Sequence, residues 1–119
     1  MTILSLLLSI AVVQDTTRTY DVGTLKRRAI VLQPAKPSAN PPLVFSFHGH
    51  GGNSRQASRS MDIQTQWPEA IVVYMEGVPT KTANDPKGER NGWQIAANND
   101  DNRDLKFFDA VYADLVKRD

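Results

Sequence analysis

Residues 45–54, FSFHGHGGNS, hold the part of this chain best suited to chemistry. His48 and His50 stand among three glycines, after a short apolar run and before a polar stretch. A strand that ends in a glycine-rich turn and enters a helix leaves backbone N–H groups without partners, and these groups can bind an anion or an oxyanion. The segment therefore predicts an anion-binding turn, whose ligand must be identified from the pattern of residues.

Nucleotide and metal ligands fit this pattern poorly. The dinucleotide fingerprint GxGxxG is matched at Gly49 and Gly51, but Ser54 stands where the third glycine is required. A phosphate P-loop needs GxxxxGK followed by Ser or Thr, and the chain contains no such string. A metal site on His48 and His50 lacks a third ligand at a recognised spacing. We therefore expect no cofactor and no metal.

An oxyanion hole is the best match. In α/β-hydrolases an HGGG-type loop after the third strand supplies one oxyanion donor, and the N–H after the nucleophile supplies the other. The string HGHGG at 48–52 has this form. Gly49 and Gly51 would let the backbone turn tightly, so that the N–H of His50 points at the developing negative charge. For the His48 ring we favour a hydrogen bond within the loop over contact with a ligand. A glycine turn without function remains the alternative for the whole loop.

The elements that must position this loop alternate between strand and helix patterns. Residues 17–22 and 28–32 flank Gly23 and predict an antiparallel hairpin. The apolar runs 43–47 and 70–74 predict strands that are covered on both faces, as in a parallel sheet. The order predicts an α/β protein whose sheet begins antiparallel and becomes parallel, with helices on its faces.

Two helices and one loop complete this pattern. The polar stretch 53–66 predicts a helix with Asn53 or Ser54 as its N-cap. Four prolines within 34–42 predict an exposed loop. A second helix is expected at 104–118, where apolar residues recur on one face. These apolar residues are Leu105, Phe108, Tyr112, Leu115 and Val116.

The N-terminal stretch predicts export. Residues 3–13 form an uncharged apolar run that is too short to span a bilayer but has the usual length of a signal-peptide core. Ser9 and Ala11 supply a cleavage pattern, although no Lys or Arg precedes the run. A buried first strand or helix is the alternative. We expect a signal peptide at 1–14, a secreted or periplasmic location, and no membrane contact after cleavage.

Composition excludes several other functions. Lys and Arg total 14 against 13 Asp and Glu, so the formal net charge of +1 gives no field that would attract nucleic acid. The chain has no Cys, which excludes a disulfide framework, a thiolate metal site and a Cys nucleophile. With 119 residues, it has room for one domain at most.

Four blocks of sequence carry a resemblance to a known family. They are PLVFSFHGHGGN at 42–53, VVYMEGVP at 72–79, NGWQ at 91–94 and DDNRDLKFFDAVYADL at 100–115. In order and spacing they resemble the N-terminal half of the polyhydroxybutyrate depolymerase and feruloyl esterase family. That family comprises secreted serine esterases of the α/β-hydrolase fold, which often act on polymer-linked esters. The resemblance covers roughly residues 20–119.

The resemblance implies roles for individual residues. The backbone N–H of His50 would be the oxyanion donor in a loop shaped by Gly51, while His48, Gly49 and Trp93 would lie at the substrate. For Trp93, packing beneath the site is an equally open interpretation. The family commonly has Cys where this chain has His50, a change that keeps the main-chain donor and alters the side chain. The implied substrate is an ester, including polymer-linked ones such as polyhydroxyalkanoates or plant cell-wall esters.

The nucleophile is missing from this pattern. In α/β-hydrolases it lies in GxSxG after a later strand, and no serine of this chain stands between two such glycines. We therefore expect residues 15–119 to form the N-terminal half of an α/β-hydrolase domain, truncated before the nucleophile elbow and inactive by itself. A half domain of this kind should be marginally stable. The alternative is a non-catalytic small α/β protein that keeps the glycine loop as a structural or ligand-binding turn.

Overall fold

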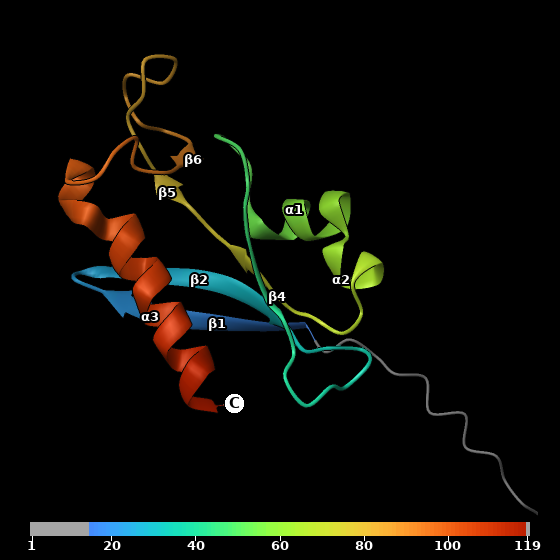
Figure 1. The fold of residues 1–119 in the computed structure, drawn as a ribbon. Coiled ribbons are helices and arrows are strands. Elements are labelled where there is room, and N and C mark those ends of the chain that lie inside the picture. The colour runs from blue at the N-terminus through green and yellow to red at the C-terminus, as the bar shows by residue number, and fades with distance from the viewer. Residues whose placement is uncertain (1–14, 119) are drawn as a thin grey trace, which may run out of the picture.

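The computed structural model describes residues 15–118, so the expected signal peptide at 1–14 lies outside the described residues. Four strands form one mixed sheet in the order β1-β2-β4-β3 (Figure 1). They are β1 (Asp15–Val22), β2 (Leu25–Leu32), β3 (Leu43–Phe47) and β4 (Ile71–Met75). The pairs β1/β2 and β2/β4 are antiparallel, whereas β3 and β4 are parallel. The predicted change from antiparallel to parallel pairing is confirmed.

Helices cover both faces of this sheet. In Figure 1, α3 (Arg103–Arg118) crosses one face, while α1 (Ser54–Met61) and α2 (Ile63–Gln66) lie on the other. The expected helix at 53–66 is thus two helices, separated at Asp62, whose φ of +47° breaks the helical path. Asn53 is the N-cap of α1, as predicted, because its side-chain oxygen accepts the N–H of Gln56 at 2.8 Å. Among the described residues, no helix is long and apolar enough to cross a membrane.

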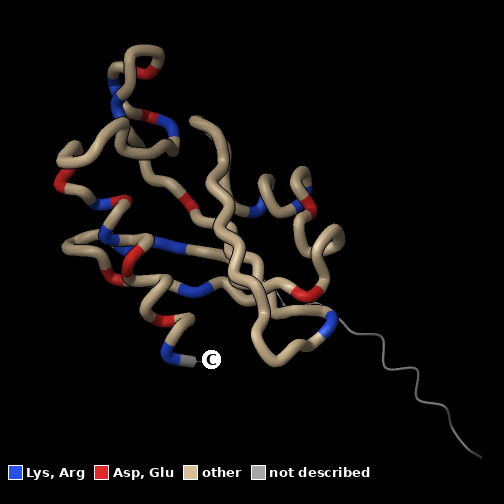
Figure 2. The backbone as a smooth tube through the Cα atoms, in the orientation of Figure 1, with Lys and Arg blue, Asp and Glu red and all other residues tan. Residues whose placement is uncertain are grey.

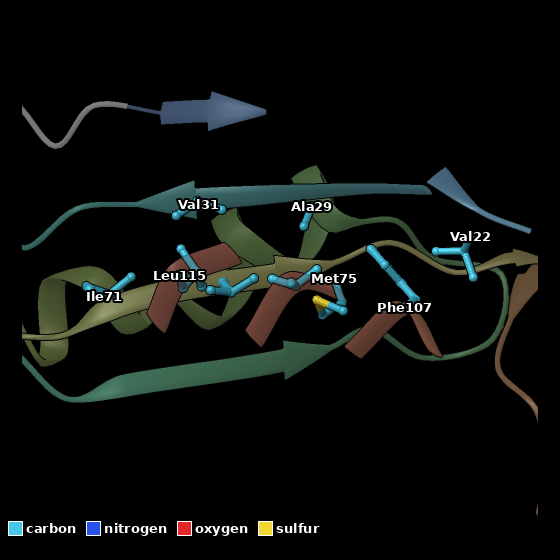
Figure 3. Packing of buried hydrophobic residues seen from close by; sticks show 9 residues of the cluster. Val22, Ala29, Val31, Ile71, Met75, Phe107 and Leu115 are labelled. Carbon is cyan, nitrogen blue, oxygen red and sulfur yellow. The ribbon is translucent and has the colours of Figure 1, made fainter. Parts of the chain in front are cut away.

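The core consists of two layers that meet at β4. All five residues of β4 are buried, and successive side chains point to opposite faces of the sheet. Ile71 and Met75 pack in the layer under α3, which also contains Phe107 and Leu115 (Figure 3). Tyr74 belongs to the layer under α1 and α2. β4 therefore has apolar cover on both sides, as its continuous apolar run predicted. The same expectation fails for the edge strand β3, which is mostly half-buried and leaves Phe47 exposed.

The buried face of α3 agrees only in part with the expected one, since Leu115 is buried and Phe108 packs against the core as predicted. Sequence periodicity placed five apolar residues on one face, but three of these are about half exposed: Leu105, Tyr112 and Val116. The side chains that face the sheet are those of Asp104, Phe107, Val111 and Leu115. Both sets have helical spacing, so periodicity alone does not decide which set is buried. The ion-pair partner of the buried Asp104 explains which set faces the sheet.

That partner is Arg27 on β2, whose side chain is fully buried. Its Nη2 lies 2.7 Å from Oδ1 of Asp104 and 3.2 Å from the carbonyl oxygen of Glu76. The guanidinium also lies 4.4 Å from the centre of the Phe107 ring. Burial lowers the pKa of Arg27, and the Asp104 carboxylate opposes this shift by stabilising the charged form. The ion pair fixes the rotation of α3 over the sheet, since an unpaired charge here would be costly.

We expect Arg27→Met to destabilise the chain by about 3–5 kcal/mol, because the substitution leaves the Asp104 carboxylate buried without its partner. Urea unfolding followed by circular dichroism measures the loss. Lys26→Met is the matched control, since the Lys26–Asp21 pair is about three-quarters exposed and should contribute less than about 1 kcal/mol. Should Arg27→Met not fold, addition of Asp104→Asn should recover folding. Equal losses in the Arg27 and Lys26 variants would contradict the assignment.

Candidate functional site

A cleft of about 420 Å³ lies where β3 ends and α1 begins. It is lined by residues 48–52, by one side of α1 and by Arg90. The sequence-predicted residues His48, Gly49, His50 and Gly51 therefore come together in one place. A larger groove of about 720 Å³ lies between the proline-rich loop and α3, but no histidine, carboxylate or basic side chain lines it. The smaller cleft is the candidate site because it combines backbone donors with titratable groups.

The backbone N–H groups of the loop fall into two kinds. The N–H of Gly51 donates to the carbonyl of Asn91 at 2.7 Å, and that of Gly52 donates to the carbonyl of Gly49 at 3.0 Å. Within residues 15–118, the N–H groups of Gly49 and His50 have no acceptor. Gly51 itself has a φ of +87°, a backbone conformation that favours glycine. Gly51 therefore shapes the loop, while the N–H of His50 stays available to a ligand.

His48 is buried and uses both ring nitrogens inside the chain. Its Nε2 lies 2.9 Å from the backbone nitrogen of Gly77, and its Nδ1 lies 2.7 Å from the carbonyl oxygen of Gly49. Because a backbone N–H only donates, Nε2 must be the acceptor, which assigns the proton to Nδ1. This neutral tautomer ties the loop to the end of β4. The arrangement agrees with the structural role favoured for this ring.

His50 is held by a carboxylate that the sequence did not point to. Its Nε2 lies 2.9 Å from Oδ2 of Asp85, which also accepts the backbone N–H of Arg90 at 3.0 Å. The pKa of Asp85 is lowered to about 2, mainly by the hydrogen bond from His50 and next by that from the Arg90 backbone. The carboxylate is therefore ionised at neutral pH and accepts a hydrogen bond from the Nε2–H of His50. Thirty-five positions separate the two residues, and no spacing rule links them.

A short hairpin brings Asp85 to the loop. The strands β5 (Val78–Pro79) and β6 (Asn91–Gly92) pair antiparallel and are joined by the polar segment 80–90 (Figure 1). Asp85 and Arg90 of this segment lie against His50 and Gly51. A Cβ atom at Gly92 would collide with the His50 ring, and one at Gly77 would lie 2.5 Å from the Gly92 carbonyl oxygen. Glycine at these positions is what allows the hairpin to approach the loop so closely.

Trp93 packs beneath the loop. Its indole Nε1 donates to the carbonyl oxygen of His48 at 2.7 Å. The ring lies edge-to-face against Phe47, with 5.1 Å between the ring centres, and it also touches the core under α3. Of the two interpretations left open by the sequence, these contacts support packing under the site. Trp93 thus holds the start of the glycine loop in place.

The described residues contain neither a histidine hydrogen-bonded to a hydroxyl group nor a cluster that could hold a metal ion. Neither imidazole forms a hydrogen bond with a hydroxyl group among residues 15–118, and the hydroxyl of Ser54 instead donates to Glu76 at 3.1 Å. The same residues contain no cluster of three or more His, Asp or Glu side chains that could hold a metal ion.

No protein-family model matches the chain, and no curated protein matches it at a significant level. The resemblance to esterases thus rests on the four sequence blocks named above. The geometry of the glycine loop is an observation that does not depend on this resemblance.

Trp93→Phe should destabilise the chain by about 1–3 kcal/mol, because the carbonyl of His48 loses its donor while an aromatic ring remains against Phe47. Thermal and urea unfolding measure this loss, and amide chemical shifts of residues 48–52 report whether the loop moves. Trp67→Phe is the control, since Trp67 is 46% exposed, and it should change stability by no more than about 0.5 kcal/mol. An unchanged loop in Trp93→Phe would show that the indole does not hold it.

The stability of the chain should depend on Asp85 in acid. The pKa of Asp85 is 3.8 in the unfolded chain and about 2 in the folded chain, so ionisation of this carboxyl favours folding. This contribution is present above about pH 4 and is lost as the pH falls through about 2. Thermal unfolding at intervals between pH 5 and pH 2 should therefore show a steeper decline for the natural chain than for Asp85→Asn.

Asp109→Asn serves as the control for this titration. Asp109 is exposed on α3 and makes no hydrogen bond or ion pair with residues 15–118 outside its own helix. Its variant should keep the slope of the natural chain. Parallel curves for the natural chain and Asp85→Asn would contradict the role given to the Asp85–His50 hydrogen bond.

Proposed function

We propose that this chain provides the oxyanion-binding part of a carboxylic-ester hydrolase that uses a serine nucleophile within an α/β-hydrolase fold. The observation that carries the proposal is the unpaired backbone N–H of His50, in a glycine loop between the third strand and the following helix. α/β-Hydrolases keep one of their two oxyanion donors in this loop. The mixed sheet, antiparallel at β1 and β2 and parallel at β3 and β4, supports the same assignment.

The chemistry follows from where charge develops in the reaction. Attack on an ester carbonyl places a negative charge on its oxygen, and a donor 2.7–3.1 Å from that oxygen stabilises the transition state. One such donor is worth about 10²–10³ in rate, provided that it need not be moved into place. Three hydrogen bonds anchor the loop here, and they involve the side chains of Trp93, His48 and Asp85. The His50 N–H is therefore preorganised for its role.

The substrate and location follow from the resemblance. The proposed substrate is an ester, including one linked to a polymer such as a polyhydroxyalkanoate or a plant cell-wall ester. Secretion or periplasmic export by the segment 1–14 belongs to the same proposal. The nucleophile would come from a GxSxG segment, which this sequence does not contain, so no covalent step is assigned to residues 15–118.

Titration of the ¹⁵N-labelled chain with the monomethyl ester of methylphosphonic acid tests the proposal, because this tetrahedral anion resembles the charged intermediate. The amide protons of Gly49 and His50 should shift downfield as they bind the phosphonate oxygen. Those of Gly51 and Gly52 should move little, since both already donate within the chain. These two amides are thus internal controls in the same loop.

Neutral dimethyl methylphosphonate is the matched ligand control, with the same tetrahedral phosphorus, one added methyl group and no charge, and it should leave all four amides in place. If the anion leaves Gly49 and His50 unmoved, the loop is a structural turn and the proposed function fails. Turnover of p-nitrophenyl acetate well above the buffer rate by the same sample would contradict the assignment of a partial site.

A further inference from the structure

Arginine side chains line the cleft beside the glycine loop and the depression next to it. Arg90 lines the cleft itself, while Arg55 and Arg59 line an adjoining depression that shares Gln56 and Ser60 with it. Neither hollow has an Asp or Glu side chain in its lining. Figure 2 shows the same imbalance along α1, which carries basic positions without an acidic one. An approaching anion therefore meets positive charge on more than one side.

Arg90 is positioned next to the oxyanion loop. Its Nη1 and Cδ lie 3.7 and 3.6 Å from the point that a Cβ atom on Gly51 would occupy. Its Nε lies 3.8 Å from Oδ2 of Asp85, and its Nη2 donates to the carbonyl of Asn84 at 3.5 Å. Within residues 15–118, Nη1 has no acceptor, and over half of the side chain is exposed. The guanidinium thus has one side held and one side open to a ligand.

The two arginines of α1 have no ion-pair partner in the described chain, although the Glu76 carboxylate accepts hydrogen bonds from Ser54 at the start of the helix. Arg55 and Arg59 form no ion pair with any carboxylate in the described chain, and both are exposed. Asp85 is the carboxylate nearest to Arg90, and it is already engaged by His50 and by backbone N–H groups. The arginines line the rim formed by the cleft and the adjoining depression, whereas Asp85 lines neither. The rim therefore attracts a carboxylate more strongly than the neutral end of an ester.

We propose that Arg90, assisted by Arg55 and Arg59, binds a free carboxylate carried by the ester substrate. The favoured substrates are then acidic esters, such as the carboxylate end of a polyester chain or the monoester of a dicarboxylic acid. A guanidinium suits this ligand because its parallel N–H groups match the two oxygens of a carboxylate. The inference rests on the proposed function, since it selects among the esters presented to the same loop.

Binding of monomethyl succinate, dimethyl succinate and inorganic phosphate tests this inference. The three probes present an ester with a carboxylate, an ester without one, and an anion without an ester. Dissociation constants come from the amide shifts of residues 48–52 and from the Nε–H signal of Arg90. The natural chain should bind the monoester about tenfold more tightly than the diester, as expected for one charge-assisted hydrogen bond.

Arg90→Gln should remove this preference, while Lys87→Gln should keep it. Lys87 is the matched control because it lies on the same loop, is exposed, and lines neither hollow, so both variants lose one positive charge. Arg55→Gln and Arg59→Gln should each weaken monoester binding about two- to threefold, as expected for exposed charges. Equal binding of the monoester and the diester, or equal effects of the Arg90 and Lys87 variants, would overturn the inference.

Two further outcomes separate this inference from the proposed function. If phosphate binds as tightly as the monoester and loses affinity equally in Arg90→Gln, the rim takes an adventitious ion only and the inference fails. If the phosphonate leaves Gly49 and His50 unmoved while the monoester still binds through Arg90, the proposed function fails and carboxylate binding stands. If the phosphonate moves both amides while monoester and diester bind alike, only the inference fails.

Discussion

Arg27 places a positive charge inside the protein, between the sheet and α3, and much of the structure follows from how that charge is held. Asp104 pairs with it at 2.7 Å and with its other oxygen accepts the backbone N–H of Gln94 at 2.5 Å. The side chain of Gln94 in turn accepts the N–H of Asp104 at 2.9 Å, which satisfies a free donor at the start of α3. One buried charge thus fixes both the first turn of the helix and the segment that precedes it.

The candidate site is connected to this centre through Trp93, the neighbour of Gln94. Its indole supports the carbonyl of His48, and the His48 ring accepts the N–H of Gly77 at the end of β4. The loop is therefore held by the core on one side and by the β5–β6 hairpin on the other. These contacts use the ring and the carbonyl of His48. Within residues 15–118 the N–H groups of Gly49 and His50 stay without an acceptor. A rigid loop with unpaired donors is what the binding of an oxyanion requires.

Local sequence patterns predicted most elements and the hairpin pairing, but not the side-chain partners that are distant in sequence. The hairpin around Gly23, the strand β3 and the helix α3 were found because periodicity and glycine act within a few residues. The break at Asp62 and the turn before α3 were missed. That turn includes η1 (Asn99–Asn102) and has positive φ angles at Asn98, Asp100, Asp101 and Asn102. Asn and Asp tolerate this conformation, but nothing in their spacing requires it. The buried face of α3 was predicted only in part for a related reason, since Arg27, the partner of Asp104, lies far away in sequence.

The same distinction explains which parts of the site were predictable. Glycine allows the tight turn that presents backbone N–H groups, so the loop at 48–52 was evident from the sequence. Asp85 and Arg90 were not, because their roles depend on a hairpin that folds back over the loop. Asp85 accepts from the His50 ring and from the Arg90 backbone, so one ionised group orients both the donor loop and the nearest arginine. Asp85 also lies 3.8 Å from Nε of Arg90, so it holds one side of the guanidinium, while Nη1 has no acceptor within residues 15–118.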